Sequence, residues 1–344
     1  MTMSSRERVD AAFRHQEPDR LPWCELLVDP FLVTKMLGWG PQNQTFSLED
    51  QQYTIEEAKE VAGFLGLDNL TYILRAPVFA EKHEGQDGRL FYGEGLIKTR
   101  GEMKMFHLPD PAPGGDAFWD PVKRFVDGKG DYSAWLVTRM GIMPTMLSMG
   151  TTAFSLALFD DRTFVEEMFD RYVEWTCVVA ERAGQIGFDA FATTDDVAFG
   201  STTFFSPKVF RELCMDRYRE LERHLAIPWV YHSDGNMMPF MKELVTLDVV
   251  CFHPMEKGAM DPRETKRKYG DRLCLMGNVD LNLLGMGTPT DVDEEVKGLI
   301  RDLAPGGGYI MASGNSLAGY LIPENVLAMR DAVRKYCRYP IRVE

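Results

Sequence analysis

Short apolar segments alternate with amphipathic helical patterns along the chain, and this alternation restricts the fold more than any other feature. Eight such segments fit buried strands: residues 23–28, 70–74, 134–138, 190–193, 229–232, 249–252, 273–276 and 309–312. The clearest helix between them covers residues 164–186, where apolar side chains recur every three or four positions. Apolar strands that alternate with helices predict a parallel sheet covered by helices.

Eight strand–helix units close most naturally into a barrel, so we predict an α/β fold of the (β/α)8 TIM-barrel type. An open doubly wound sheet is the alternative, although no GxGxxG sequence follows a predicted strand. A length of 344 residues suits a single barrel domain over residues 1–344.

An N-terminal helical and hairpin elaboration precedes most of the barrel. Residues 4–16 predict an amphipathic helix, because Ser4 and Glu7 have the spacing of a capping box. A second helix is expected over residues 49–65, and the Gly-rich residues 91–106 predict an inserted hairpin.

The composition excludes several classes of partner. A net charge of −14 argues against binding to nucleic acid or an anionic membrane, since both need a basic stripe. The basic run at residues 266–268 fits a solvated helix end. Six cysteines without CxxC spacing fit reduced thiols, and neither a signal peptide nor a membrane span is evident, so we expect a cytoplasmic protein. A homodimer is compatible with an acidic barrel of this size.

Barrel active sites form where strands end, and polar residues gather after the later predicted strands. Asp195 and Asp196 follow the fourth strand, where they either cap the next turn or take part in chemistry. His232 and Asp234 follow the fifth strand, and their spacing suits a divalent metal or an oriented acid–base pair. The alternative is a capping Asp234 beside a core histidine. His253, after the sixth strand, either braces its loop or contacts a ligand.

Two aromatic residues stand before an expected helix N-cap at Ser206. Phe204 and Phe205 either pack onto that helix as a hydrophobic staple or cover an apolar substrate.

Together these segments resemble the uroporphyrinogen decarboxylase superfamily. The resemblance is carried by 195–198, 206–210, 232–236, 277–280, 306–310 and 315–325. This superfamily includes the true decarboxylases and corrinoid-dependent methyltransferases. The decarboxylases have an Arg-rich motif near the N-terminus that binds substrate carboxylates, whereas residues 20–26 here contain the acidic Glu25 and lack that motif. The methyltransferase branch is therefore the better match.

The resemblance also implies a metal site. Coenzyme M-type members hold zinc through a His-x-Cys pair after the fifth strand and a Cys after the eighth. Here Asp234 replaces the first Cys and Asn315 stands near the second. His232 and Asp234 are the expected zinc ligands, and the harder ligand set suits a substrate that reacts at oxygen.

The resulting hypothesis is a corrinoid-dependent O-demethylating methyltransferase. It would move a methyl group from a methoxylated, aromatic compound to the cobalt of a separate corrinoid protein. The candidate catalytic residues, which would stabilise the leaving oxygen, are His232, Asp234, Asp195, Asp196 and Glu25. The expected substrate-binding side chains are Trp23, Phe204, Phe205, Tyr231, Met237, Met255, Met276, Asn278 and Asn315.

Two other functions stay open. A decarboxylase or lyase acting on a carboxylated ligand would keep the fold without a corrinoid partner. A non-catalytic barrel would tolerate mutation of His232 or Asp234.

Overall fold

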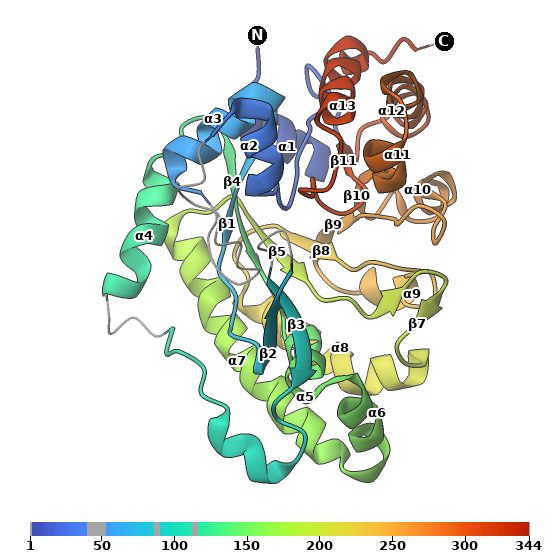
Figure 1. The fold of residues 1–344 in the computed structure, drawn as a ribbon. Helices are drawn as coiled ribbons and strands as arrows, with labels where there is room; N and C mark the ends of the chain where they lie inside the picture. The colour runs from blue at the N-terminus through green and yellow to red at the C-terminus, as the bar shows by residue number, and fades with distance from the viewer. Residues whose placement is uncertain (1, 40–52, 86–89, 112–115, 344) are drawn as a thin grey trace.

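The computed structural model describes residues 2–39, 53–85, 90–111 and 116–343. Seven parallel strands form one curled sheet in the order β1-β4-β5-β8-β9-β10-β11 (Figure 1). Their bounds are β1 Asn69–Ile73, β4 Ser133–Thr138, β5 Ala190–Thr194, β8 Trp229–His232, β9 Val249–His253, β10 Cys274–Val279 and β11 Tyr309–Ser313. Seven of the eight expected strands are therefore confirmed.

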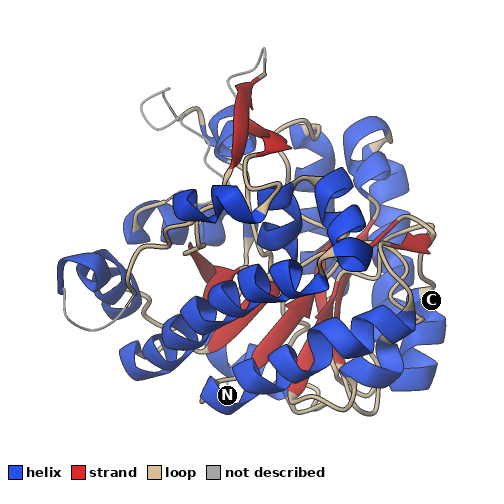
Figure 2. Cartoon of the chain, turned by 90° about the horizontal axis from the view of Figure 1, so that it is seen from below, coloured by secondary structure: helices blue, strands red, loops and turns tan. Residues whose placement is uncertain are grey.

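Helices lie around the strands of this sheet (Figure 2). Their bounds are α1 Ser5–Phe13, α2 Pro30–Leu37, α3 Ile55–Leu65, η2 Arg100–Met105 (a 3-10 helix), α4 Asp116–Asp127, α5 Ile142–Met149, α6 Thr151–Asp160, α7 Arg162–Ile186, α8 Pro207–His224, α9 Met241–Leu244, α10 Pro262–Tyr269, α11 Leu281–Met286, α12 Pro289–Leu303 and α13 Pro323–Tyr336.

The two faces of the sheet have separate cores. Alternate strand residues such as Val137, Val230 and Cys251 share a core with side chains of α1, whereas the intervening residues pack against the outer helices. Phe13 of α1 lies 5.9 Å from Trp135, measured between ring centroids. Helix α1 thus fills the inner face of the sheet near the strand beginnings.

The predicted first strand, residues 23–28, is not a regular strand. Trp23 and Val28 form isolated bridges to Met311 and Leu317. On the side of β1, the Asn69 side chain takes the place of a backbone ladder: its Oδ1 accepts from Glu25 N at 3.0 Å, and its Nδ2 donates to Glu25 O at 2.9 Å. This substitution explains why the apolar sequence does not become a continuous strand.

The inserted hairpin lies earlier than predicted. It consists of β2 Ala80–Glu84 and β3 Leu90–Gly95, and the second half of the predicted range forms η2 instead. Four of the five residues of β2 are exposed, so the strand has no apolar alternation that a sequence pattern could detect. A second small hairpin, β6 Ala198–Phe199 with β7 Thr202–Thr203, was not predicted.

Most predicted helix boundaries are confirmed by their caps. Ser4 and Glu7 form the expected capping box of α1, and Ser206 caps α8. The predicted helix 49–65 matches α3 from Ile55, while residues 49–52 lie outside the described residues. The basic run 266–268 occupies the last turn of α10. All six cysteines are free and buried, as reduced thiols should be.

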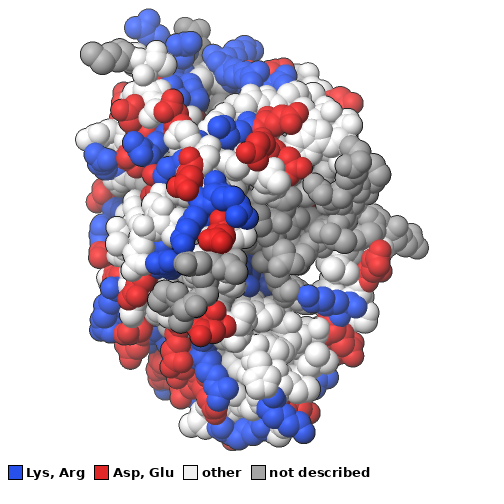
Figure 3. All heavy atoms as spheres, turned by 90° about the vertical axis from the view of Figure 1, so that its left-hand side faces the viewer, with Lys and Arg blue, Asp and Glu red and all other residues white. Residues whose placement is uncertain are grey.

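No single helix of the described chain is long and apolar enough to cross a membrane. Helices α5 and α6 reach that length and composition only as a pair, and they are bent by 104° relative to each other. On the face shown in Figure 3, acidic and basic side chains are interspersed.

Candidate active site at the carboxyl ends of the strands

Strand register places a row of polar side chains at the carboxyl edge of the sheet. Thr194 of β5 pairs with His232 of β8, and His232 pairs with His253 of β9. Val230 and Cys251, two positions earlier, belong to the inner core, so His232 and His253 project to the same inner side. The expected convergence of the β5, β8 and β9 ends is therefore confirmed.

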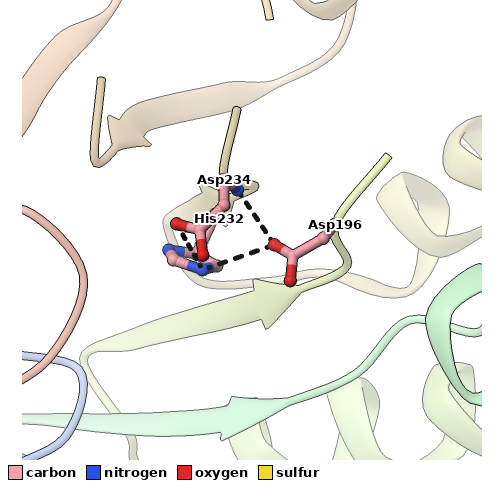
Figure 4. A group of neighbouring side chains, drawn as sticks. All are labelled: Asp196, His232 and Asp234. Atoms are coloured by element: carbon pink, nitrogen blue, oxygen red, sulfur yellow. Dashed lines mark hydrogen bonds and ion pairs between the residues drawn. The ribbon is translucent and has the colours of Figure 1, made fainter. Parts of the chain in front are cut away.

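His232 faces two carboxylates. Its Nε2 lies 3.6 Å from Asp196 Oδ1 and 3.7 Å from Asp234 Oδ1. The side chains point toward one another from the ends of two neighbouring strands (Figure 4). The side chain of His232 is 8% exposed and those of both aspartates are 28% exposed, so the cluster is recessed and reachable by solvent.

Asp234 is held by groups from other strand ends. Its Oδ2 accepts from Asn315 Nδ2 at 2.6 Å, and its backbone N donates to Asp196 Oδ1 at 2.9 Å. Burial, followed by repulsion from Asp196 and Glu256, raises the pKa of Asp234 to about 8. The structure thus brings the predicted Asn315 onto the predicted ligand Asp234.

A hydrogen-bond relay fixes the tautomer of His232. His253 Nε2 lies 3.3 Å from the Ser313 carbonyl oxygen, which can only accept, so this nitrogen carries the proton. Burial holds the pKa of His253 well below its usual value, which keeps the ring neutral and its Nδ1 an acceptor. His232 Nδ1, 2.7 Å away, must donate to it. The lone pair of His232 Nε2 therefore points at the two carboxylates, and His253 acts as a brace.

Asp195 has a different function from its neighbour Asp196. Its buried carboxylate accepts backbone N–H bonds from Met140, from Gly141 at 3.2 Å and from Met143 at 2.8 Å. Two of these donors precede α5, and Met143 lies in its first turn. Asp195 therefore caps the start of α5 and not the turn that follows it in the chain, and these buried bonds take the place of its expected catalytic role.

Glu25 lies in the interior, where Ser313 connects it to His253, the neighbour of His232. Its carboxylate accepts from Trp23 Nε1 at 2.8 Å, and from Ser313 N at 2.8 Å and Ser313 Oγ at 2.7 Å. Burial raises its pKa to about 7 in spite of these three bonds. Both residues thus join the 22–28 segment to β11. Trp23 is 1% exposed in the outer core, which corrects its expected place in the substrate wall, whereas the catalytic role expected for Glu25 stays a prediction.

Most of the predicted aromatic wall belongs to the outer core. Tyr231 projects outward, where its hydroxyl lies 3.2 Å from that of Tyr218. Phe205 is buried against Phe210 and Phe240, as the staple alternative predicts. Successive side chains of β8 point to opposite faces of the sheet. Because His232 points inward, Tyr231 points outward and cannot line a site on the inner side.

Phe204 alone of the predicted aromatic residues stays exposed at the rim. Its ring centroid lies 5.1 Å from that of Phe199, across the β6–β7 hairpin. This hairpin touches the Asp234 loop, because a Cβ at Gly235 would lie 2.4 Å from Phe199 N.

The remaining predicted contacts are buried. Met237, Met255 and Met276 are fully enclosed, and Met276 belongs to the inner core. Asn278 Nδ2 donates to Met255 O at 2.6 Å, while its buried Oδ1 has no hydrogen-bond partner among the described residues. None of the three methionines is exposed, so their expected place in the substrate wall is corrected.

Two arginines at the same edge were missed by sequence reasoning. Arg75 follows β1 and Arg139 follows β4, and Arg75 Nη2 donates to Thr194 Oγ1 at 3.2 Å. Protein packed around the guanidinium, together with the charge of Arg139, lowers the pKa of Arg75 to about 9. Their positions directly after predicted strands were the available signal.

The cluster fits a divalent metal ion. The ligand atoms of Asp196, His232 and Asp234 all lie within 4.8 Å of one another. Asp234 Oδ1 is buried and accepts no hydrogen bond from the described residues, which is costly unless a cation or proton reaches it. Three ligands with an open position are typical of catalytic zinc. Asp196, a further candidate from the sequence, thus lies within reach of the same ion as His232 and Asp234.

Comparisons with known proteins agree on one family. Residues 140–336 match the family model described as uroporphyrinogen decarboxylase (URO-D). The uroporphyrinogen decarboxylase of Pseudoalteromonas translucida is 32% identical over 73 residues, 21% of this chain and 20% of that protein. That of Alkalilimnicola ehrlichii is 21% identical over 264 residues, 72% of this chain and 71% of that protein. The chain thus matches about a fifth of the length of the first relative.

The fold is also shared with a solved methyltransferase from Methanosarcina mazei. The two superpose with a TM-score of 0.76 over 97% of this chain and 99% of that chain, at 18% identity. The family match spans more than half of the chain and includes Asp196, His232, Asp234 and Asn315. The protein therefore belongs to the uroporphyrinogen decarboxylase (URO-D) family.

Proposed function

We propose that this protein is a methyltransferase that moves a methyl group from a methoxylated, aromatic compound to the cobalt of a separate corrinoid protein. The observation that carries the proposal is the Asp196–His232–Asp234 cluster, whose ligands are oxygen and nitrogen only and whose Asp234 Oδ1 is unsatisfied. The methyltransferase name of the structural relative from Methanosarcina mazei is compatible with it.

A zinc ion held by Asp196, His232 and Asp234 would supply a positive charge beside the ether oxygen of the substrate. Hydrogen bonds within the chain orient two of these ligands. His253 keeps the lone pair of His232 Nε2 directed at the carboxylates, and Asn315 holds Asp234. Such supporting hydrogen bonds fix ligand orientation and protonation state.

The leaving oxygen needs stabilisation because methyl transfer to cobalt(I) breaks the carbon–oxygen bond and leaves its electron pair on oxygen. In the absence of an ion, Asp234 with a pKa of about 8 retains a proton at neutral pH. That proton can be donated to the leaving oxygen, as general acid catalysis requires. The cluster can therefore offset developing negative charge through a proton or a bound cation.

Exposed aromatic side chains at the rim support an aromatic substrate. Phe199 and Phe204 are 55% and 36% exposed, and their hairpin contacts Gly235 beside Asp234. An exposed aromatic pair next to a polar site suits the stacking of a flat ring. The corrinoid partner would approach the same rim, at the carboxyl ends of the strands.

We also propose that residues 1–344 form one domain in which segment 22–28 takes the eighth position of a (β/α)8 barrel. Its hydrogen bonds to β11 on one side and to Asn69 on the other support this closure. Replacing Asn69 with Ala should then lower the free energy of unfolding by about 2 kcal/mol, because two buried backbone groups lose their partners.

The test is a metal analysis of the purified protein, followed by assays with cob(I)alamin and a panel of methoxylated benzenes. We expect about one zinc per chain and loss of demethylation on chelation. The matched control for His232→Ala is His224→Ala, because His224 is a partly exposed histidine on α8. Release of CO2 from uroporphyrinogen without any demethylation would instead favour the decarboxylase alternative.

A further inference from the structure

The buried carboxylate of Glu25 is used mainly to hold one residue, Ser313. Glu25 is 2% exposed, and its carboxylate accepts from the backbone N–H of Ser313 at 2.8 Å and from the Ser313 hydroxyl at 2.7 Å. A further hydrogen bond comes from Trp23 Nε1. Because the burial of a carboxylate is costly, a group of this kind in the interior requires a reason.

Attachment of the 22–28 segment to the barrel does not require this carboxylate. Cys24 N donates to Met311 O at 3.0 Å, and Met311 N donates to a carbonyl oxygen of the segment at 2.9 Å. These backbone bonds join the segment to β11 whatever side chain stands at Glu25. The carboxylate therefore acts on Ser313 itself.

Ser313 connects this carboxylate to the histidines of the candidate active site. Its carbonyl oxygen lies 3.3 Å from Nε2 of His253, whose ring is fully buried. Ser313 is the last residue of β11, so the regular strand ends at the point where this carbonyl group must be held. By bonding both the backbone N–H and the hydroxyl of Ser313, Glu25 fixes the direction of the carbonyl group that faces His253.

The direction of this carbonyl group decides the tautomer of two rings. His253 and His232 are stacked with their ring centroids 4.9 Å apart and their Nδ1 atoms 2.7 Å apart. With Ser313 O as its acceptor, His253 has its proton on Nε2 and accepts from His232 at Nδ1. Without that acceptor, the buried Nε2–H of His253 would lose its partner, which favours protonation of Nδ1 instead. His232 would then have its own proton on Nε2 and could not bind a metal ion there.

The far side of the His232 ring does not prevent this change. Nε2 of His232 lies 3.6 Å from Asp196 Oδ1, and a carboxylate attracts a proton placed on that nitrogen. In the metal-free protein, Asp196 therefore favours the tautomer that cannot bind a metal ion. The hydrogen bonds between Glu25 and Ser313, at the opposite end of the chain of bonds, work against it.

We infer that Glu25 is a positioning residue: through Ser313 and His253 it holds His232 in the tautomer whose Nε2 lone pair is free to bind a metal ion. The inference rests on the metal site of the proposed function and not on the methyl-transfer reaction. In this role Glu25 acts without contact to the ion.

The first test determines the tautomers in metal-free protein by NMR, from the nitrogen chemical shifts of isotope-labelled histidines. Wild-type protein should have His232 protonated on Nδ1 and His253 on Nε2, and the variants His232→Gln and His253→Gln identify the two sets of signals. Glu25→Ala should move His232 to the Nε2 tautomer. Glu25→Gln should not, because its amide can accept from Ser313 N and donate to Ser313 Oγ.

The matched control is Asp29→Ala. Asp29 is another buried carboxylate, 3% exposed, and it accepts from the backbone N–H groups of Phe31 and Gly319, each at 2.8 Å. These bonds are separate from the chain of bonds that leads to His253. Asp29→Ala should lower the unfolding midpoint, as Glu25→Ala does, and leave both tautomers unchanged.

A milder variant keeps the test decisive if Glu25→Ala does not fold. Ser313→Ala removes only the hydroxyl bond to Glu25, so it should move His232 toward the Nε2 tautomer by a smaller amount. Wild-type tautomers in the folded members of this pair of variants overturn the inference.

The second test measures zinc affinity by calorimetry. Glu25→Ala should weaken zinc binding by about 10- to 100-fold, whereas Glu25→Gln and Asp29→Ala should stay within about threefold of wild type. Altered tautomers and weaker zinc binding, without demethylation of any methoxylated compound, would refute the proposed reaction and leave the inference standing. Demethylation by wild-type protein, with equal zinc affinity in Glu25→Ala, would refute the inference alone.

Discussion

Asp195 and Asp196 are adjacent in sequence and do different work. The carboxylate of Asp195 is buried and accepts from backbone N–H groups at the start of α5, and that of Asp196 faces His232 at the rim. The strand geometry separates them, since successive side chains point to opposite sides. Sequence alone indicated that this pair mattered but could not divide the roles.

Replacement by asparagine should therefore lower mainly the stability of the fold at Asp195 and mainly the zinc content at Asp196. Asp195→Asn leaves buried N–H groups unsatisfied and should lower the free energy of unfolding by about 3 kcal/mol. Asp196→Asn keeps an oxygen for the Asp234 N–H and should change stability by less than about 1 kcal/mol, while zinc content falls. Urea unfolding and metal analysis of both variants check this, and the reverse pattern would contradict the two assignments.

Glu25 predicts a pH dependence of stability. Its pKa is raised from 4.5 to about 7 in the folded protein, so the unfolded chain releases this proton first as the pH rises. Its contribution is therefore full below about pH 4.5, declines by roughly 3 kcal/mol up to about pH 7, and is constant above that. In Glu25→Gln this decline should be absent from urea unfolding curves recorded between pH 4.5 and 8. A parallel pH profile in both proteins would contradict the buried carboxyl.

At the scale of elements, the strands that were predicted well are those buried on both faces. β4 and β10, for example, are buried throughout, and their apolar sequences identified them. The failures have local causes. Segment 22–28 is apolar but pairs through an Asn69 side chain, and β2 pairs although four of its five residues are exposed. Register, which decided between His232 and Tyr231, comes from pairing across strands that one sequence does not reveal.

The contact between the β6–β7 hairpin and the β8 loop is tight enough to test. Gly235 has φ +78°, and a Cβ there would lie 2.4 Å from Phe199 N. Gly235→Ala should push the hairpin and the Asp234 loop apart and reduce zinc affinity by about tenfold or more. Gly258→Ala is the matched control, since Gly258 has φ +84° with nothing within 4 Å of its Cβ position. Equal zinc affinity in both variants would show that the contact does not position Asp234.

At the scale of the whole molecule, the described part of the chain has cavities that lie outside the candidate active site. The volume of a cavity is therefore not enough to identify the active site. One of about 600 Å³ lies between the loop before α10 and α12 and is lined by residues such as Lys257 and Glu295. Another of about 450 Å³ lies between β3 and α6. Neither includes His232, whereas register and buried polar atoms both lead to the rim.

Metal binding at that rim should stabilise the whole chain. A ligand that binds only the folded state at a hundred times its Kd contributes about 2.7 kcal/mol. For a protein of 344 residues this corresponds to a rise in Tm of about 4 °C. Calorimetry of metal-free protein with and without zinc measures it, and Asp234→Asn should remove most of the shift. An identical shift in that variant would place the ion elsewhere.

The position of helix α1 bears on the order in which the proposed methyl donor and partner protein bind. Its side chains Val9, Ala12 and Phe13 fill the inner face of the sheet at the end opposite to His232. In the proposed function, the methyl donor and the demethylated product would therefore enter and leave at the His232 end, where both aspartates of the cluster are 28% exposed. If a corrinoid protein docks on that rim, as we propose, it would cover the site; the methyl donor would then bind before the partner, and the demethylated product would leave after the partner dissociates.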